Sequence, residues 1–271
     1  MAKTETVNEP KDLIEATPEE LEKVEKEMQE TLSESQVTEK LKKLDRRERD
    51  EKVDVVSSWV PRTKLGKAVK AGKEKDLDKI LSEGKRILEP EIVDALIRPE
   101  TDLIFIGQAK GKFGGGKRRA WRQTQKKTME GNVLSFSSMA VVGDRKGHIG
   151  VGYGKAKETL PAREKALRHA KLNIIKIEPG FESPESEKDK SDPHTIPFKI
   201  EGKSGGVRIS LWPAPRGTGL VINDECKKIL RLAGIKDIYS KTEGKTKTAF
   251  NLAKACVQAL SKTTQMRSQA K

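Results

Sequence analysis

Glycine occupies every second position in one short stretch of this chain, at Gly150, Gly152 and Gly154. The stretch from His148 to Tyr153 has the character of a β-strand, and the side chains of a strand point alternately to its two faces. Glycines at this spacing therefore leave one face of the strand without side chains. Glycine inside a strand indicates that another backbone or a ligand approaches closely. We expect a tightly packed helix on this face, close contact with RNA, or both.

The helix expected after this strand has small residues along one side. Thr159 and Pro161 supply its start, and we expect it to run to Asn173. At 3.6 residues per turn, one side presents Ala162, Ala166, Leu167, Ala170 and Ile174. The basic residues Lys165, Arg168 and Lys171 fall on the opposite side. We therefore predict that the alanine side packs on a sheet and that the basic side faces solvent or RNA.

Strand-like and helix-like segments alternate in two successive groups, which indicates an α+β fold. The first group has strands at 103–106, 132–142 and 148–153, followed by the helix just described. The second group has strands at 196–201, 207–212 and 235–239, a helix at 223–232 and a last helix that begins at Thr246 or Thr248. The sequence therefore predicts two α+β domains in succession.

Shorter segments flank these domains. Residues 1–50 are net acidic although the whole chain carries a net charge of +14, so we interpret them as a separate extension. Thr17 and Pro18 supply a helix start within it. Residues 62–75 read as a basic linker, with short helices near Leu77 and after Pro90. The predicted boundaries are a charged helical extension (1–50), a basic lead segment (51–101), a first α+β domain (102–180), a linker (181–193), a second α+β domain (194–264) and a tail (265–271).

The segment 107–127 is rich in glycine, lysine and arginine and contains no acidic residue. Its cations are Lys110, Lys112, Lys117, Arg118, Arg119, Arg122, Lys126 and Lys127. Uncompensated positive charges repel one another, and a polyphosphate backbone relieves that repulsion. Glycine brings backbone N–H groups close to phosphates, and the interleaved rings of Phe113 and Trp121 suit stacking on unpaired bases. We interpret the segment as an RNA-binding loop rather than a basic loop without a ligand.

Further cations lie close to the glycine strand and are predicted to join these phosphate contacts. They are Arg145, Lys146, His148, Lys155 and Lys157, together with Arg168 on the basic side of the helix. The basic segment 107–127 has few amide side chains suited to reading base edges. We therefore expect recognition of phosphates and of RNA shape rather than of base sequence.

The basic segment also matches part of a nucleotide-binding motif. Gly111, Gly116 and Lys117 satisfy G-x-x-x-x-G-K, the phosphate-binding loop of many NTP hydrolases. That loop needs a serine or threonine at the next position to hold Mg²⁺, and Arg118 stands there. The residues that follow also lack the apolar stripe of a helix. We therefore reject an NTP hydrolase.

No pattern in the chain indicates an enzyme, a metal site or a membrane protein. The three histidines lack metal-ligand spacing, and Cys226 and Cys256 stand among apolar helix residues, where we expect core thiols. No apolar stretch is long enough to cross a bilayer, and the first residues lack the apolar segment of a secretory signal. We expect no catalytic residue, no metal and no cofactor. The charged fraction of 35%, above the usual ~25%, favours a polyanionic partner.

Several motifs, in order along the chain, resemble one ribosomal family. The run from Val141 to Gly152, followed by Gly154-Lys155, resembles the signature of the universal S-five family of small-subunit ribosomal proteins. The segments 196–203, 213–220 and 232–237 are similar to its C-terminal half. The segments 59–66 and 88–94 are similar to the lead of its archaeal and eukaryotic branch. Residues 1–50 match no part of the family.

The resemblance implies a double-stranded-RNA-binding-like first domain and a β-α sandwich as the second. It implies a structural, cytoplasmic, ribosome-bound protein that binds ribosomal RNA near the mRNA entry and decoding region and contributes to translational accuracy. The neighbouring fourth small-subunit protein and mRNA are the other implied partners, and Arg216 in the 213–220 motif joins the RNA contacts. A free double-stranded-RNA-binding regulator is the alternative.

The family's RNA-reaching loop corresponds to Gly131-Asn132 rather than to the glycines near Gly114. Most members have a basic residue and two glycines at this loop. This chain has Glu130 and a single glycine instead, which changes the chemistry available at the loop.

Overall fold

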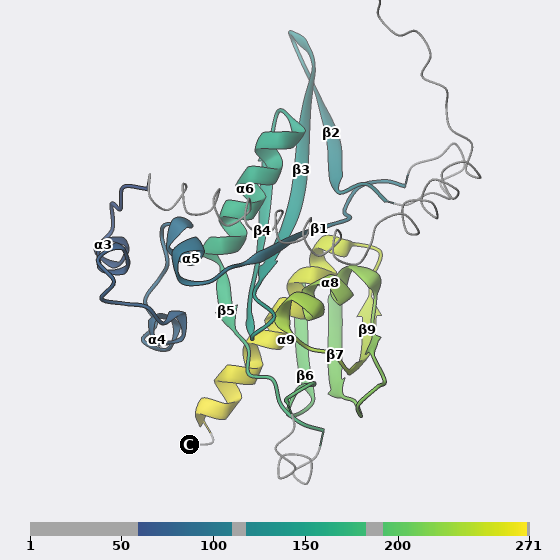
Figure 1. Cartoon of the computed structure of the whole chain (residues 1–271). Helices are drawn as coiled ribbons and strands as arrows, with labels where there is room; N and C mark the ends of the chain where they lie inside the picture. Colours follow the sequence, from purple (N-terminus) through teal and green to yellow (C-terminus); the bar gives the residue numbers. More distant parts are fainter. Residues whose placement is uncertain (1–58, 110–117, 183–191, 270–271) are drawn as a thin grey trace, which may run out of the picture. The chain divides into compact units, whose positions relative to one another are not determined.

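A computed structural model of the protein describes residues 59–109, 118–182 and 192–269. The predicted helical extension, the cations Lys110, Lys112 and Lys117, the aromatic Phe113 and most of the predicted linker lie outside these residues. The described strands form two sheets (Figure 1). Strands of the first sheet fall between residues 100 and 176, and strands of the second between 200 and 244. The predicted α+β class is confirmed.

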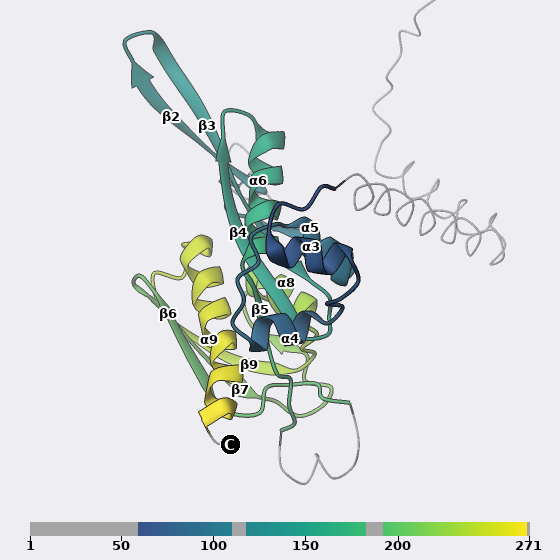
Figure 2. The same ribbon diagram turned by 90° about the vertical axis from the view of Figure 1, so that its left-hand side faces the viewer.

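The first sheet is built around one long strand. Its elements are β1 (Glu100–Ile104), β2 (Trp121–Thr128), β3 (Gly131–Gly143), β4 (His148–Ala156), β5 (Ile174–Lys176) and the helix α6 (Thr159–Leu172). β1 and β2 pair with successive halves of β3 along one edge, and β4 pairs along the other. All pairings in this sheet are antiparallel. The β2–β3 hairpin extends beyond the end of α6 (Figures 1 and 2).

The glycine face of β4 is covered by α6. Ala162, Ala166 and Ala170 are fully buried there, as the helical spacing predicts. A Cβ atom placed on Gly152 would lie 2.1 Å from the Ala170 nitrogen and 2.2 Å from the Ala166 carbonyl oxygen. Gly150 and Gly154 meet the helix backbone equally closely. Of the two expected occupants of this face, the structure contains the helix.

The second domain combines a second sheet with two helices. Its elements are β6 (Ile200–Ser204), β7 (Val207–Pro213), β8 (Leu220–Val221), α8 (Asp224–Ala233), β9 (Ile238–Gly244) and α9 (Ala249–Gln269), with the strands in the order β6-β7-β9-β8. The Asn223 side chain accepts a hydrogen bond from the Glu225 N–H and caps α8, and Gly234 ends it with φ at 89°. Cys226 and Cys256 are fully buried, as predicted.

One apolar core joins the two sheets. Ile104, Met139, Val141 and Ile149 of the first sheet pack with buried residues of α8, α9 and the second sheet. Side chains alternate along a strand, so these residues lie on the face of the first sheet opposite α6. The first sheet is therefore covered on one face by α6 and on the other by the second domain, and neither cover reaches the distal part of the β2–β3 hairpin (Figure 2).

From residue 59 on, where its description begins, the lead segment has the short helices α3 (Lys64–Lys70), α4 (Leu77–Ser82) and α5 (Glu91–Leu96). The helices near Leu77 and after Pro90 were predicted. α3 lies where we expected a basic linker, because its few apolar residues, such as Val69, enter a small separate core. Ile174 of β5 contributes to the same core.

A buried histidine fastens this lead segment to the sheet. The His148 Nδ1 atom lies 2.6 Å from Asp144 Oδ2, and Nε2 lies 2.7 Å from Asp78 Oδ1 of α4. The Lys176 ammonium lies 3.1 Å from the second oxygen of Asp78. Burial by itself lowers the pKa of His148, but its hydrogen bonds to the two carboxylates outweigh burial and raise that pKa. For the same reason the pKa values of Asp144 and Asp78 are lowered despite burial.

Several boundaries differ from the prediction. β2 occupies the second half of the segment predicted as a glycine-rich loop, and this mostly polar stretch forms a strand because all eight of its residues pair with β3. β6 starts at Ile200 rather than 196, β5 was not predicted, and α9 continues into the predicted tail. β9 starts at Ile238 rather than 235, because the N–H groups of Lys236 and Asp237 bond to the His194 carbonyl instead of a strand.

The contact between α6 and β4 should tolerate no added atom. We expect Gly152→Ala to destabilise the protein by about 1–3 kcal/mol, because the new methyl group overlaps backbone atoms that cannot rotate away. Gly206→Ala is the matched control, since nothing lies within 4 Å of its Cβ position, and should change stability by less than about 0.5 kcal/mol. Urea unfolding of both variants measures this. Equal stability of the two variants would contradict the close approach.

The histidine contact should make stability depend on pH. A raised folded-state pKa means that His148 contributes most below the ordinary value of 6.5 and that this contribution is lost as pH rises through the folded-state pKa. We expect the melting temperature of the wild type to fall relative to that of His148→Gln between about pH 6 and about pH 9. The exposed His169 supplies the control variant His169→Gln, which should follow the wild type. Parallel curves for wild type and His148→Gln would show that the ion pairs contribute nothing.

Candidate nucleic-acid interface

The β2–β3 hairpin carries exposed cations on both of its faces. Arg122 and Lys126 alternate with Lys127 along β2, so the first two lie on one face and the third on the other. All three side chains are exposed. The strand pairing places Lys126 opposite Val133 and Lys127 opposite Asn132. A polyanion can therefore approach the arm from either side and meet positive charge.

The tip of the arm is a short turn. The Thr128 hydroxyl donates a hydrogen bond of 2.9 Å to the Gly131 carbonyl, and Gly131 has φ at 116°, a conformation that favours glycine. Met129 is fully exposed, and Glu130 is the acidic residue of the turn. The turn lies where the family resemblance places the RNA-reaching loop.

Two further arginines lie at the base of the arm. Arg118 pairs with Ala109 in an isolated β-bridge, and the Gly107 N–H donates to the Arg119 carbonyl at 2.9 Å. A Cβ atom on Gly107 would lie 2.1 Å from the Trp121 carbonyl oxygen, so glycine is needed for this approach. Both arginine side chains are exposed. They extend the positive surface of the arm toward the body of the protein.

The sheet adds a second row of charge. Arg122 of β2 and Lys155 of β4 are both register partners of Ser137 on β3, so the three side chains share one face of the sheet. The Ser137 hydroxyl donates a hydrogen bond to the Arg122 carbonyl. Lys157 is exposed just beyond β4. The structure therefore brings together Arg118, Arg119, Arg122, Lys126, Lys127, Lys155 and Lys157 along one arm and its base.

The other predicted contacts lie elsewhere. Arg145 and Lys146 lie in the β3–β4 turn, at the end of β3 away from the hairpin tip, about 40 Å distant at the usual rise per strand residue. Arg145 also forms an ion pair of 2.7 Å with Glu100. Arg168 is exposed on α6. The Arg216 guanidinium, in the second domain, donates to the Asp192 carbonyl at 3.0 Å.

His148 does not suit the role of an RNA contact. The side chain is buried, and both ring nitrogens contact carboxylates, those of Asp144 and Asp78. Neither nitrogen is left for a phosphate, and the neighbouring carboxylates would repel one. We therefore remove His148 from the predicted RNA contacts. The sequence could not show this, because Asp78 is 70 residues away along the chain.

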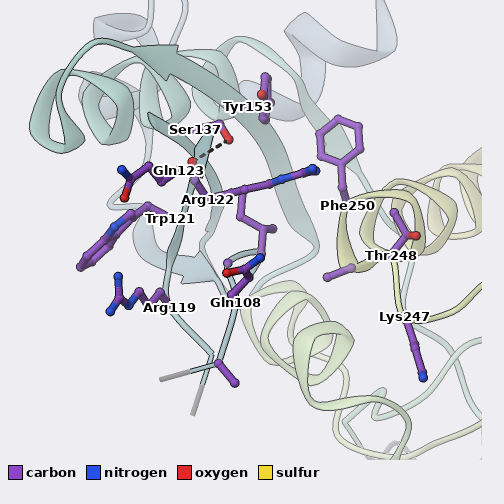
Figure 3. Close-up of a pocket in the computed structure, with 14 residues that line it drawn as sticks. Gln108, Arg119, Trp121, Arg122, Gln123, Ser137, Tyr153, Lys247, Thr248 and Phe250 are labelled. Atoms are coloured by element: carbon purple, nitrogen blue, oxygen red, sulfur yellow. Dashed lines mark hydrogen bonds between the residues drawn. The ribbon is translucent and has the colours of Figure 1, made fainter. Parts of the chain in front are cut away.

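The sequence patterns also left out residues that the fold places beside Arg122. Tyr153, Lys247 and Phe250 line the same cleft as Arg122 (Figure 3). Tyr153 could have been found from the glycine alternation, which puts it on the face opposite α6. No local signal connects Lys247 or Phe250 to this sheet.

Other site classes find no support in the described part of the chain. Its histidine, cysteine and carboxylate side chains form no group of three or more that could hold a metal ion. None of its helices combines the length and apolar character that crossing a bilayer requires. The arm and its base are thus the strongest candidate surface.

Comparison with known proteins relates both domains to one family. Residues 120–178 match the model for the N-terminal domain of ribosomal protein S5, and residues 202–271 match the model for its C-terminal domain. Small ribosomal subunit protein uS5 of Nanoarchaeum equitans is 48% identical over 216 residues, which cover 79% of this chain and 91% of that protein. The uS5 proteins of Hyperthermus butylicus and Methanospirillum hungatei are 43% and 42% identical, over 78% of this chain and 92% and 95% of theirs. These relatives agree with the family resemblance of the sequence motifs.

Proposed function

The chain belongs to the archaeal-type branch of the ribosomal protein S5 family, and from that membership we propose that it is a structural constituent of the small ribosomal subunit rather than an enzyme. Its ligand is ribosomal RNA. The observation that carries the proposal is the β2–β3 arm, which exposes Arg122, Lys126 and Lys127 without a salt-bridge partner among the described residues.

The first domain is proposed to act as a double-stranded-RNA-binding-like module. Cations on both faces of a narrow arm suit insertion between phosphate backbones of folded RNA, and phosphate contacts of this kind position a protein without reading sequence. Elsewhere on the protein, exposed lysines form ion pairs with carboxylates, and the two charges of each pair neutralise one another. The Lys199 ammonium, for example, lies 2.9 Å from the Glu201 carboxylate. No described carboxylate forms an ion pair with Arg122, Lys126 or Lys127 of the arm, so their charge is available to RNA.

The location on the subunit is a finer part of the same proposal. We place the protein in the cytoplasm on the ribosome, near the mRNA entry and decoding region, with the fourth small-subunit protein as neighbour, mRNA within reach and an effect on translational accuracy. These statements rest on the family resemblance together with the name of the relatives, small ribosomal subunit protein uS5.

Salt dependence of RNA binding tests the arm. Each lost phosphate contact lowers the slope of log affinity against log salt by about 0.7–0.9. Replacing Arg122, Lys126 and Lys127 with alanine should therefore flatten the slope on a ribosomal RNA fragment by roughly 2–3. The matched control replaces Lys79, Lys199 and Lys241, which are paired with carboxylates. It removes the same charge and should leave the slope unchanged. Equal slopes for both triple variants would mean that overall charge, not the arm, attracts RNA.

Sedimentation tests the assignment to the ribosome. On a sucrose gradient of native cell extract at moderate salt, we expect the protein to migrate with small subunits. Dissociation of the subunits should leave it with the small one. A protein found only in the light fractions, yet able to bind duplex RNA, would be a free double-stranded-RNA-binding regulator instead.

A further inference from the structure

We propose that the cleft between the first sheet and the start of α9 holds one unpaired nucleotide, its base against Tyr153 and Phe250 and its phosphate between Arg122 and Lys247. The inference rests on the proposed RNA-binding function and adds a separate subsite to it. The arm contacts phosphates of folded RNA, whereas this cleft requires a single-stranded residue.

The cleft has the size and the composition for this ligand. It encloses about 730 Å³, within the range of roughly 300–1,000 Å³ typical of small-molecule sites. Segments from five parts of the chain form its walls, around Gly107, Trp121, Ser137, Tyr153 and Phe250. Its charged lining residues are Arg119, Arg122 and Lys247, and no carboxylate is among the described residues that line it. An anion is therefore favoured over a neutral or cationic ligand.

The Arg122 side chain and the rings of Tyr153 and Phe250 approach one another in this space. Figure 3 shows the Arg122 side chain extending from β2 toward Tyr153 and Phe250, with Lys247 on the other wall. The Tyr153 and Phe250 ring centroids are 5.2 Å apart at an interplanar angle of 74°. Tyr153 is 38% exposed although it belongs to β4 of the first sheet. The Lys254 ammonium, 4.3 Å from the Phe250 ring centroid, adds positive charge beside the rings.

Cations combined with an exposed ring, Tyr153, and a half-buried one, Phe250, favour an unpaired nucleotide over other anions. A base in a duplex has both faces covered by its neighbours, whereas an unpaired base can stack on an aromatic side chain. A free phosphate or an acidic peptide would use the cations but has no need of the rings. The arrangement therefore points to an RNA strand that leaves a helix near the base of the arm.

Two RNA probes separate the cleft from the arm. One is a blunt duplex of about 16 base pairs, the span of a double-stranded-RNA-binding domain. The other is the same duplex with a 3′ overhang of about four uridines. Binding of each probe to the full chain is measured by fluorescence anisotropy. We expect the wild type to bind the overhang probe more tightly than the blunt one.

The cleft variants should remove this preference and nothing else. Tyr153→Leu should weaken binding of the overhang probe by at least about fivefold and leave blunt-duplex binding unchanged. Lys247→Gln should lower the salt slope on the overhang probe alone by about 0.7. Tyr239→Leu is the matched control, since this tyrosine of β9 is 42% exposed and lies outside the cleft. Melting temperatures identify any variant that has lost its fold, and Tyr153→Phe should restore binding because it keeps the ring.

The outcomes distinguish the two proposals. The cleft inference is wrong if the wild type shows no preference for the overhang probe. It is also wrong if the two cleft variants weaken binding of both probes equally, or if they weaken binding of neither probe. If a double variant of Lys126 and Lys127, which lie outside the cleft, binds the blunt duplex like the wild type, the proposed role of the arm is wrong. Binding of a polyglutamate peptide that competes with the overhang and survives Tyr153→Leu would assign the cleft to an acidic protein segment and overturn the inference.

Discussion

The backbones of α6 and β4 are in direct contact, and the rest of the first domain is arranged around that contact. Gly150, Gly152 and Gly154 remove the side chains from one face of the strand, and buried alanines remove bulk from the helix. A helix seated this closely can hold only one register, because each backbone atom meets a fixed partner. The side chains of Ile149, Val151, Tyr153 and Lys155 alternate with these glycines and point to the opposite face, where Ile149 enters the core shared with the second domain.

The length of β3 gives this packed body a projecting arm. The 13 residues of β3 extend beyond both α6 and the second domain (Figure 2), so the half of β3 that pairs with β2 projects as an arm. Residues on an uncovered hairpin need no apolar face, which leaves β2 free to carry cations and amides. In water, exposed charges cost little free energy even without partners, and a rigid strand pair holds them in place for a polyanion. Where the arm joins the body, the same strand places Arg122 beside the aromatic cleft.

The lead segment is held by a different balance of forces. Its short helices bury a small apolar cluster, and His148 adds a polar link from the sheet to Asp78. A histidine between two carboxylates is stable when it is protonated, so this link is strongest where the imidazole is charged and the carboxylates are ionised. Near a positively charged surface, these carboxylates serve the fold rather than the RNA.

The sequence by itself determined the features that follow from local spacing. Alternating glycines and the alanine stripe predicted a close helix–sheet contact, the cap at Asn223 and Gly234 bounded a helix, and the acid-free basic segment included Arg122, Lys126 and Lys127 of the proposed RNA-binding arm. The tertiary structure decided what depends on residues far apart in the chain. β2 is a strand only because β3 pairs with it. His148 links the sheet to the lead segment only because Asp78 reaches it. Lys247 and Phe250 line the same cleft as Arg122 only because α9 packs beside the first sheet. Spacing along a chain encodes periodicity within one element, whereas contacts between elements arise only when the whole core has packed.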